Sequence, residues 1–573
     1  MPRLLLRLAA MLRWPRPIAA WLLGFAFALP GLFSAPPLDR DESRFAQASV
    51  QMLETRDFIR IRFQEEARNK KPAGAYWLQA ASVAAFSDRE DRAIWAHRLP
   101  SALAAGFAAL FTYLAGARLF DRRIALLGAA LFSASVLAST EGMIAKTDAL
   151  LCACATGALA ALAMLRTRGM ERSGRWAALG FWAAIGIGIL IKGPLAPMIA
   201  ALCLLGAMLW ERRAAWAAPL LHPLGLLAVI AFVAPWTIAI GLATHGAFFA
   251  DAIGGDLGGK LRAGAEGHGA PPGMHAVLLP LLSFPITLGL PAAGLLAFQT
   301  IRAGRDAPDG AGARLLLAWI IPAWVVFELT PTKLPHYPLP LYPALALLAA
   351  AGLQSLYQRG GWRLKSLAAG LFLFAGAALT GLCAFAATQL FGDAAAGLRR
   401  AAQTLLALGL PLLGAAAVIL MARRAAWAVL AAAAFCALLL TTARERIAPE
   451  ARRLLVSDVA VAALQREGLA PERSGGGPPL LSIGYSEPSL VFLTRTDTAL
   501  RTGAAGAREA QSGQSALVEA RESADFEAGL AKRGLTFAPA GAPVMGLNYS
   551  KGREVSLQPG RVTTAAATSA PQQ

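Results

Sequence analysis

The sequence contains few charged residues. Asp, Glu, Lys and Arg make up 16% of its 573 residues, whereas soluble globular domains contain roughly a quarter. Hydrophobic residues make up 56%, and the mean hydropathy is +0.51. This composition argues against a soluble enzyme and favours a membrane protein.

Cysteine is also scarce. The chain has five cysteines, and all of them lie inside apolar runs. The spacing of Cys152 and Cys154, with one residue between them, is not that of a metal-binding pair. We therefore expect the cysteines to be small packing residues, which excludes a disulfide framework.

Apolar runs of membrane-spanning length are what the sequence has in abundance. They recur from Pro17 to Thr442, and they predict a polytopic α-helical membrane protein with about 13 transmembrane helices. The first run follows several arginines, and we interpret it as an uncleaved helix, not as a signal peptide. The predicted spans lie near residues 17–35, 94–117, 124–142, 148–165, 176–191, 194–210, 219–242, 275–300, 315–330, 335–353, 366–391, 402–421 and 426–443.

The net charge of +19 comes mostly from arginines in the short connectors between these spans. When successive spans alternate in direction, one side of the membrane receives nearly all of these arginines, which places that side in the cytoplasm. This distribution argues against a nucleic-acid partner and is compatible with binding to anionic membrane lipids. The acids, lysines and histidines of the remaining connectors then gather at the outer face.

Two long outer loops, at 36–93 and 243–274, are predicted within a transmembrane domain that covers residues 1–443. The second loop is rich in glycine, which favours a mobile lid. Residues 444–560 combine helical stretches with short apolar runs, which indicates a small α/β domain outside the membrane. Residues 561–573 are rich in Thr, Ala, Ser and Gln, and we expect them to be disordered.

The first outer loop concentrates polar residues in an otherwise apolar chain. Carboxylates at Asp39, Asp41 and Glu42 begin it, and a shielded carboxylate at a membrane boundary is suited to act as a base. From Phe45 to Met52, apolar residues recur at helical spacing, which predicts an amphipathic helix at the membrane surface. The alternative is an ordinary solvated loop.

Lysines on the outer face form a second candidate group. Lys70-Lys71-Pro72 ends the first loop, and Lys192-Gly193-Pro194 stands between two apolar runs. A lysine at headgroup level either binds a lipid phosphate or places its ammonium in water above an apolar helix. For Lys192 the alternatives are a phosphate contact and the anchor of a tight turn.

The segment Thr332–Tyr337 places Lys333, His336 and Tyr337 before a proline-rich apolar run. Such a run cannot be helical throughout, and broken backbone at membrane depth usually lines a cavity. Lys333 and His336 are therefore candidates to hold an anionic headgroup. Asp148 begins a span on the same face, where it either joins the site or simply complements the helix dipole.

Five segments in order carry a family resemblance: RDESRFAQASVQMLETRDF, NKKPAGAYWLQA, KTDALL, LIKGP and TKLPHYPLPLYPALALL. Together they resemble the polyprenyl-phosphate-dependent glycosyltransferases of the C-type fold. Within that group they are most similar to the bacterial branch that contains the lipid A aminoarabinose transferase and relatives of the protein O-mannosyltransferases.

The resemblance implies roles for named residues. Asp41 matches the family's catalytic acid, and Glu42 and Arg44 complete its motif. Lys71 matches the lysine that binds the donor phosphate. The implied catalytic residues are Asp41, Glu42 and Asp148. The implied donor-phosphate residues are Arg44, Lys71, Lys192, Lys333, His336 and Tyr337.

The resemblance does not extend to a metal site. Some relatives hold a divalent metal between an outer-loop histidine and the glutamate that precedes the Lys-Pro pair. Here that glutamate is replaced by Lys70, which disfavours a metal cofactor and leaves His268 as an isolated candidate ligand.

The expected reaction is transfer of a sugar from an undecaprenyl-phosphate-linked donor to a cell-envelope acceptor, with inversion. The resemblance places the active site and the C-terminal domain on the periplasmic side of a bacterial inner membrane. Lipid A (lipopolysaccharide) is the favoured acceptor, and another glycan or a protein is the alternative. Two other functions remain open: a lipid or glycan flippase, which predicts internal repeats that the sequence lacks, and a polymerase or ligase that uses a diphosphate-linked donor.

Overall fold

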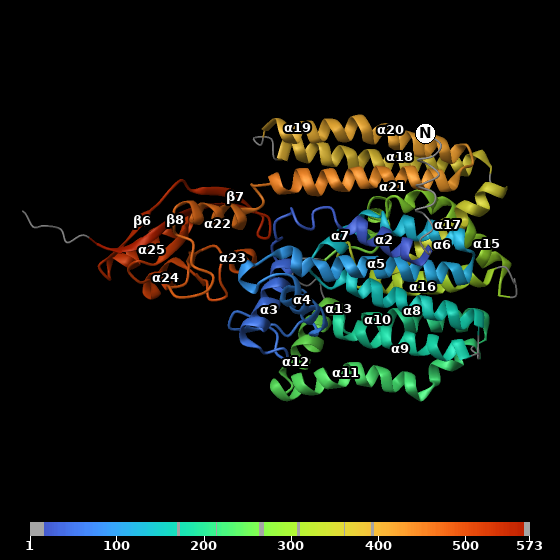
Figure 1. Ribbon diagram of the computed structural model, residues 1–573, viewed down its shortest axis with the longest axis horizontal. Coiled ribbons are helices and arrows are strands. Elements are labelled where there is room, and N and C mark those ends of the chain that lie inside the picture. Colours follow the sequence, from blue (N-terminus) through green and yellow to red (C-terminus); the bar gives the residue numbers. More distant parts are fainter. Residues whose placement is uncertain are drawn as a thin grey trace, which may run out of the picture. The chain divides into compact units, whose positions relative to one another are not determined.

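The computed structural model describes residues 16–168, 172–213, 215–262, 269–305, 310–359, 361–390 and 395–565. They belong to two compact units, which are described separately (Figure 1). The first unit comprises Met1–Phe33, Arg68–Leu78 and Arg98–Ile447, and the second comprises Ser34–Ala67, Gln79–His97 and Ala448–Gln573.

The first unit is a bundle of apolar helices. Its principal helices are α2 (Arg16–Ala28), α5 (Ile94–Leu119), α6 (Arg122–Ser133), α7 (Val136–Met143), α8 (Asp148–Arg168), α9 (Arg172–Lys192), α10 (Leu195–Glu211), α11 (Pro223–Ala243), α14 (Met274–Leu282), α15 (Leu290–Ala303), α16 (Ala311–Leu329), α17 (Tyr342–Arg359), α18 (Trp362–Phe385), α19 (Ala395–Thr404), α20 (Leu410–Met421) and α21 (Ala425–Thr441). Between α11 and α14 lie α12 (Ala247–Phe249), a π-helical segment (Ala250–Leu257) and α13 (Gly258–Arg262).

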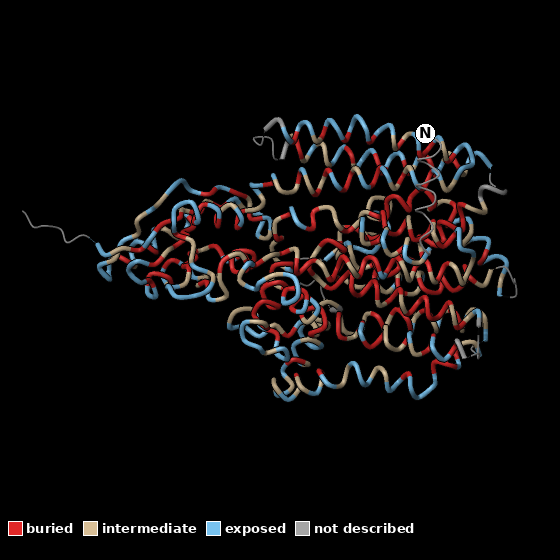
Figure 2. The backbone as a smooth tube through the Cα atoms, in the orientation of Figure 1, coloured by how far each residue is buried: buried red, intermediate tan, exposed pale blue. Residues whose placement is uncertain are grey.

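These helices confirm a multi-pass membrane protein. Within the described residues, nine helices are long and apolar enough to cross a membrane, and the bent pair α6–α7 counts as a tenth. Three shorter apolar helices, among them α2 and α10, bring the candidates to 13, the number expected from the sequence. Few residues of helix α11 are buried (Figure 2), as expected for an apolar helix that faces lipid.

Three predicted spans are interrupted. Helices α6 and α7 meet at an angle of 61°, and a 3₁₀ turn at Ile286–Gly289 separates α14 from α15. The run expected to begin near residue 335 becomes an α-helix only at Tyr342, because its prolines lack the N–H groups of a regular helix.

Small residues allow the helices to approach closely. A Cβ atom added to Gly352 of α17 would lie 2.6 Å from the Ala292 carbonyl of α15. Only glycine fits there, and close backbone approach at small residues is the usual packing of membrane helices.

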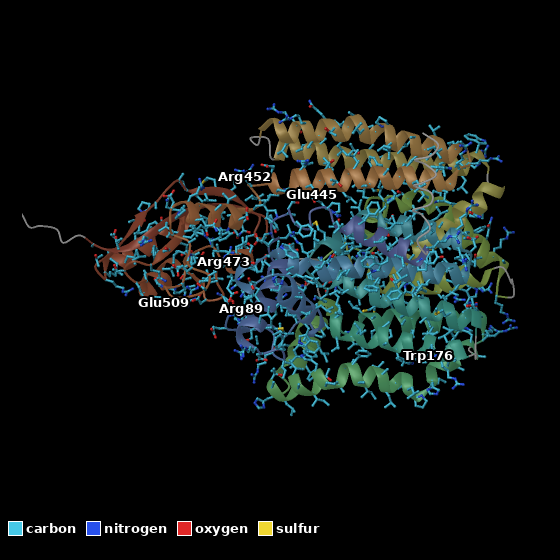
Figure 3. The ribbon with its side chains drawn as sticks, in the orientation of Figure 1. Arg89, Trp176, Glu445, Arg452, Arg473 and Glu509 are labelled. Carbon is cyan, nitrogen blue, oxygen red and sulfur yellow. The ribbon has the colours of Figure 1, made fainter. Side chains whose placement is uncertain are left out.

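The second unit joins the first outer loop to the C-terminal region. The loop supplies α3 (Asp41–Thr55), a two-stranded ribbon of β1 (Arg62–Phe63) and β2 (Glu66–Ala67), and a 3₁₀ turn at Arg89–Asp91. Helix α4 (Gly74–Phe86) runs through the boundary of the two units. The Arg473 side chain, labelled in Figure 3, donates to the Asp91 carbonyl at 2.8 Å.

The C-terminal region is an α/β fold. Its sheet has the order β4-β3-β5-β8-β6, with β7 also paired to β8; β3 is parallel to β4 and β5, and β8 is antiparallel to its three partners. The elements are α22 (Val456–Arg466), β3 (Leu481–Ile483), α23 (Pro488–Leu493), β4 (Ala499–Arg501), α24 (Gly503–Glu509), β5 (Ser515–Glu519), α25 (Ser523–Ala531), β6 (Leu535–Pro539), β7 (Val544–Asn548) and β8 (Arg553–Thr564).

Side-chain alternation along β5 explains the two cores of this fold. Leu517 packs on one face with residues of α22 and α23, whereas Ala516 and Val518 pack on the other face with residues of α24 and α25. A strand buried on both faces in this way needs apolar residues at successive positions. The predicted α/β domain is therefore confirmed.

The domain boundaries differ from those expected in two respects. Residues 34–67 and 79–97, expected to belong to the transmembrane domain, group with the C-terminal region. Strand β8 continues to Thr564, so the expected limit at residue 560 lies inside a strand. The part of the predicted disordered tail from residue 566 onward lies outside the described residues.

Candidate active site

Five charged or titratable side chains meet at one end of the first unit's bundle: Glu141, Lys146, Asp148, Lys192 and His336, hereafter the Asp148 cluster. Lys192 Nζ lies 2.6 Å from Asp148 Oδ1. Lys146 Nζ lies 3.0 Å from Glu141 Oε2 and 3.7 Å from Asp148 Oδ2. The His336 ring bridges the two acids, with Nε2 at 3.6 Å from Asp148 Oδ1 and Nδ1 at 3.9 Å from Glu141 Oε1.

Local helix chemistry brings these residues together. Helices α8 and α9 follow one another in the chain and pack side by side (Figure 1), so the first residue of α8, Asp148, lies beside the last residue of α9, Lys192. Each charge also complements its helix dipole, acid at the N-terminus and base at the C-terminus. Glu141 lies in the last turn of α7, and His336 lies in the loop that follows α16.

The Asp148 cluster is buried. Glu141 and Asp148 are each 4% exposed, and the Lys192 side chain is 9% exposed. Buried charges at the ends of membrane helices are costly unless they are paired, and they commonly mark a functional site. Lys192 Nζ also lies over the Tyr337 ring, 5.9 Å from its centroid, which adds a cation–π contact.

Lys71 lies close to this cluster. Its Nζ is 2.6 Å from Asp256 Oδ2, and the other carboxylate oxygen of Asp256 is 2.7 Å from Lys260 Nζ. Burial, together with the positive charges of Lys260 and Lys192, lowers the pKa of Lys71 to about 8, against the opposing effect of Asp256. The pairing with Lys260 and Lys71 in turn keeps the pKa of Asp256 low, despite its partial burial.

The second outer loop makes contacts with other segments, and the mobile lid expected from its glycines stays a prediction. Asn69 Nδ2 donates to Asp251 Oδ2 at 2.9 Å, next to the Lys71–Asp256 pair. After the undescribed residues 263–268, the Ala270 N–H donates to the Pro331 carbonyl at 3.3 Å.

The Lys333 ammonium donates hydrogen bonds to backbone carbonyls. The residue is 4% exposed, and its Nζ donates to the carbonyls of Ala270 at 2.9 Å and Thr330 at 2.7 Å. The structure thus brings Asp148, Lys192, His336 and Tyr337 together, with Lys71 nearby. Lys333 instead links two loops through its bonds to their backbone carbonyls. Its predicted contact with a donor phosphate would use the one N–H bond that remains.

The fold of this chain is similar to that of solved protein structures. A crystal structure of ArnT from Cupriavidus metallidurans, bound to undecaprenyl phosphate, matches with a TM-score of 0.72 at 20% identity over 97% of this chain and 98% of that one. The apo form of the same protein matches with a TM-score of 0.71 at 19% identity, over 94% of this chain and 98% of that one. The chain has the C-type glycosyltransferase fold.

Sequence similarity supports the same resemblance. A family model described as dolichyl-phosphate-mannose-protein mannosyltransferase matches residues 70–238, the part of the glycosyltransferase fold that carries Lys71, Asp148 and Lys192. An undecaprenyl phosphate-α-4-amino-4-deoxy-L-arabinose arabinosyl transferase 2 from Pseudomonas fluorescens is 30% identical over 59% of each chain. An Erwinia tasmaniensis transferase for the same lipid-linked sugar is 28% identical over 54% of each chain. The alignments therefore span little more than half of these relatives.

The three motif residues of the first loop lie in the second unit. Helix α3 begins at Asp41, which is exposed. The predicted helix is confirmed, but ten of its residues between Glu42 and Met52, polar as well as apolar, are buried, so it is not the amphipathic surface helix that the pattern predicted. Glu42 is buried, and its Oε2 accepts the Leu38 N–H at 2.8 Å, so it holds the turn that leads into the helix. Arg44 lies one turn further along the same helix.

Gln47 and Gln51, two polar residues of α3, are also buried. The amide of Gln51 bonds to both backbone groups of Gln64, at 2.7 and 3.0 Å, and Gln47 Nε2 donates to Thr496 Oγ1 at 2.7 Å. These contacts fix the loop after α3 in the second unit. Nothing in the spacing of single glutamines indicates such distant partners.

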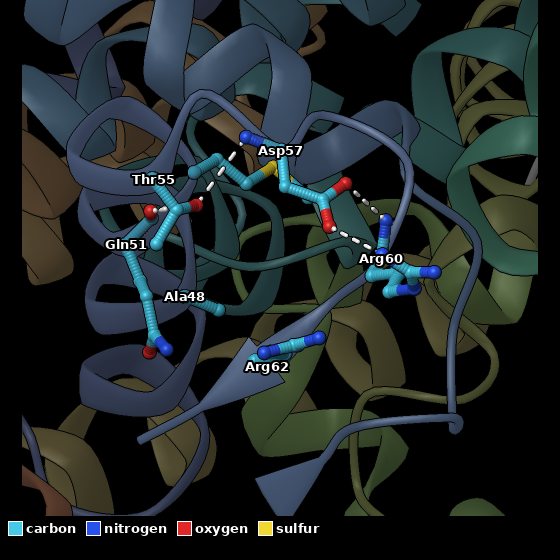
Figure 4. Close-up of a pocket in the computed structure, with 7 residues that line it drawn as sticks. Ala48, Gln51, Thr55, Asp57, Arg60 and Arg62 are labelled. Atoms are coloured by element: carbon cyan, nitrogen blue, oxygen red, sulfur yellow. Dashed lines mark hydrogen bonds and ion pairs between the residues drawn. The ribbon is translucent and has the colours of Figure 1, made fainter. Parts of the chain in front are cut away.

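Residues of α3 and of the loop that follows it line a pocket in the second unit (Figure 4). The Asp57 carboxylate accepts the N–H groups of Ile59 and Arg60, at 3.1 and 3.0 Å, and lies 3.4 Å from the Arg60 guanidinium. These bonds shape the loop on one side of the pocket. Its lining residues are Ala48, Gln51, Met52, Thr55, Asp57, Arg60 and Arg62.

The prediction about a metal stays untested. His268 lies outside the described residues. In the described part of the chain, no group of three or more His, Cys, Asp and Glu side chains is arranged to hold a metal ion. The acids of the Asp148 cluster are instead neutralised by lysines.

Proposed function

We propose that this protein is a glycosyltransferase that transfers a sugar from undecaprenyl phosphate to a cell-envelope acceptor. The observation that carries the proposal is the Asp148 cluster, with Lys71 beside it, at one end of a bundle of membrane-spanning helices. A lipid-linked phosphate needs both features: apolar helices for its tail and buried cations for its charge. The sugar named for the Pseudomonas and Erwinia relatives, 4-amino-4-deoxy-L-arabinose, is the first donor sugar to test.

In the proposed reaction, an acceptor oxygen attacks the anomeric carbon and the bond from that carbon to the phosphate oxygen breaks. Negative charge then develops on the departing lipid phosphate, where Lys71 and Lys192 stabilise it. Asp148 and Asp256 hold these lysines in place before the donor arrives. Displacement in a single step inverts the anomeric carbon.

Asp41 is the proposed group that orients the acceptor hydroxyl or takes its proton. This role rests on the sequence motif, and the exposure of Asp41 at the start of α3 is compatible with it. The Asp41→Asn protein should lose most of its transfer activity while it still folds. Full transfer by this variant would exclude Asp41 as the base.

The proposed location is the periplasmic face of a bacterial inner membrane, with lipid A as the acceptor. The location is supported by the arginines of the opposite connectors, which favour the cytoplasm. Mass spectrometry of lipid A and of glycoproteins from a deletion strain would identify the acceptor by the sugar that disappears.

The direct test is an assay with purified protein and undecaprenyl-phosphate-linked sugar, in which free undecaprenyl phosphate is measured. We expect the wild type to release it and the Lys71→Ala variant to release far less. Lys70→Ala is the matched control, because Lys70 is the exposed neighbour of Lys71 and should be dispensable. Equal loss in both variants would remove Lys71 from the site.

The same assay separates the rival functions. Release of undecaprenyl diphosphate, and not of the monophosphate, would indicate a polymerase or ligase with a diphosphate-linked donor. Movement of the intact donor across vesicles without release would indicate a flippase.

A further inference from the structure

The C-terminal part of the second unit makes hydrogen bonds to Asp39 and Arg40, the two residues that precede Asp41. These bonds are hereafter the grip. The hydroxyl and the backbone N–H of Ser489 both donate to the Asp39 carboxylate. The Asp39 N–H donates to the Tyr549 hydroxyl at 2.7 Å, and the Arg40 guanidinium donates to the Ser550 carbonyl. Ser489 lies in α23, whereas Tyr549 and Ser550 lie in the hairpin between β7 and β8.

The backbone of Arg40, next to these hydrogen bonds, has a strained conformation. Its φ is 64° and its ψ is −110°, a conformation that residues with a Cβ atom rarely adopt. Such a conformation persists only where surrounding contacts impose it. Arg40 directly precedes α3, so its conformation sets the direction in which the helix and Asp41 begin.

The gripping residues are themselves held firmly. Ser489 Oγ lies 2.5 Å from Ser457 Oγ, which bonds to the Tyr485 hydroxyl at 2.8 Å. At the hairpin, Asn548 Nδ2 donates to Glu487 Oε1 at 2.8 Å. Ser489, Ser457 and Asn548 are each at most 3% exposed, so the grip is part of the core of this unit.

Asp39 is also placed in an unusual electrostatic setting. Burial and the negative charge of Glu487 raise the pKa of Asp39 to about 6, against the opposing effects of the Ser489 bonds and the charge of Arg44. The other titratable groups that act on this site are Tyr485, Tyr549 and Glu42.

We propose that Ser489 and Tyr549 are positioning residues for the transfer reaction, through which the C-terminal α/β region holds Asp39 and Arg40 and so fixes Asp41 at the start of α3. This inference rests on the proposed function, because Asp41 acts in sugar transfer. It gives the C-terminal region a catalytic purpose without placing it in contact with substrate.

A first experiment tests the grip without any substrate. Amide hydrogen exchange of the segment 38–47 is measured in the wild type, in Ser489→Ala and in Ser482→Ala. Ser482 of β3 is the matched control, because it is a buried serine of the same unit whose hydroxyl donates to the Tyr485 carbonyl at 2.6 Å and does not bond to Asp39. We expect at least tenfold faster exchange in Ser489→Ala and unchanged exchange of this segment in Ser482→Ala.

A second experiment measures transfer by the same proteins. Ser489→Ala and Tyr549→Phe should lower kcat on the order of tenfold or more, with little change in KM, because small misplacement of a catalytic group is costly. Ser489→Thr, which keeps the hydroxyl, should restore most of the rate. Loss of the Ser489 donor raises the pKa of Asp39 further, so the acid limb of kcat/KM should move to higher pH in Ser489→Ala.

The outcomes of the two experiments distinguish failure of the proposed function from failure of the positioning role. Faster exchange in Ser489→Ala combined with no sugar transfer by the wild type would refute the proposed function and leave the grip intact. Transfer by the wild type, with kcat and the acid limb unchanged in Ser489→Ala and Tyr549→Phe, would overturn the positioning role. If Ser489→Ala does not fold, Tyr549→Phe alone decides, since it removes one hydroxyl at the edge of the unit.

Discussion

The two ends of helix α8 carry buried charges of different kinds. At its first residue, Asp148 pairs with Lys192 and approaches Lys146 and His336. At its far end, about 27 Å away for 18 residues of helix, Arg166 and Arg314 share the single carboxylate of Glu211. The second group, Arg166, Glu211 and Arg314, is hereafter the Glu211 cluster.

The difference lies in what else the cations bind. In the Glu211 cluster, Arg166 also donates to the Ala311 carbonyl at 3.2 Å and lies 5.4 Å from the centroid of the Trp216 ring. The guanidinium is permanently charged and fixed by planar contacts, whereas a lysine ammonium is a mobile point charge. The Glu211 cluster therefore fastens α8, α10 and α16 together. The Asp148 cluster has lysines and an imidazole, which can change partners or protonation when a phosphate arrives.

The largest expected effect is on stability, at the Glu211 cluster. Glu211→Ala leaves two buried guanidiniums without their acid, which should lower the free energy of unfolding by about 3–5 kcal/mol. Thermal unfolding in detergent measures this loss. Transfer per folded molecule should stay near the wild-type rate, and a catalytic defect without loss of stability would reverse the roles assigned to the two ends.

The next largest effect is expected on kcat, at the Asp148 cluster. Lys192→Ala removes a cation from the departing phosphate and should lower kcat by on the order of 10²–10³-fold, as loss of a charge-stabilising donor typically does. Its melting temperature should fall less than that of Glu211→Ala, because Lys146 and His336 still face Asp148. A kcat within tenfold of the wild type would mean that Lys192 only anchors the turn at Gly193.

A smaller effect is expected from pH. Because the pKa of Lys71 is lowered to about 8, this lysine loses its positive charge as the pH rises above that value. The kcat/KM for the lipid-linked donor should then fall by up to about tenfold per pH unit. Lys71→Arg keeps its charge at all these pH values and should remove this alkaline limb. An unchanged limb in that variant would assign it to another group.

The smallest effect is expected at Lys333. Lys333→Met removes the bonds to the Ala270 and Thr330 carbonyls and should cost about 1–3 kcal/mol of stability. The loss of kcat should be well below that of Lys192→Ala. A rate loss as large as that of Lys192→Ala would show that Lys333 acts on the donor phosphate, as the sequence motif implied.

Much of this comparison was predictable from sequence. Hydropathy located the spans, and the alternation of arginine-rich connectors placed Asp148, Lys192 and His336 at one end and Arg166 and Arg314 at the other. Those features are encoded locally, by runs of apolar residues and by the charges that end them.

The missing parts depend on partners far apart in the chain. Lys71 and Asp256 are separated by 185 residues, and Asp39 and Ser489 by 450. Neither pair has a periodicity or spacing that signals it. For the same reason the sequence assigned the whole of residues 36–93 to the transmembrane domain, although Ser34–Ala67 and Gln79–His97 group with the C-terminal region.

The most direct test of this account is the affinity for undecaprenyl phosphate itself. Its Kd should be measured in detergent for the wild type, Lys192→Ala and Arg314→Ala, with each variant shown to be folded. We expect Lys192→Ala to weaken binding at least tenfold, about 1.4 kcal/mol, and Arg314→Ala to leave the Kd unchanged. Equal weakening by both variants, or no weakening by Lys192→Ala, would contradict the claim that the Asp148 cluster receives the lipid phosphate.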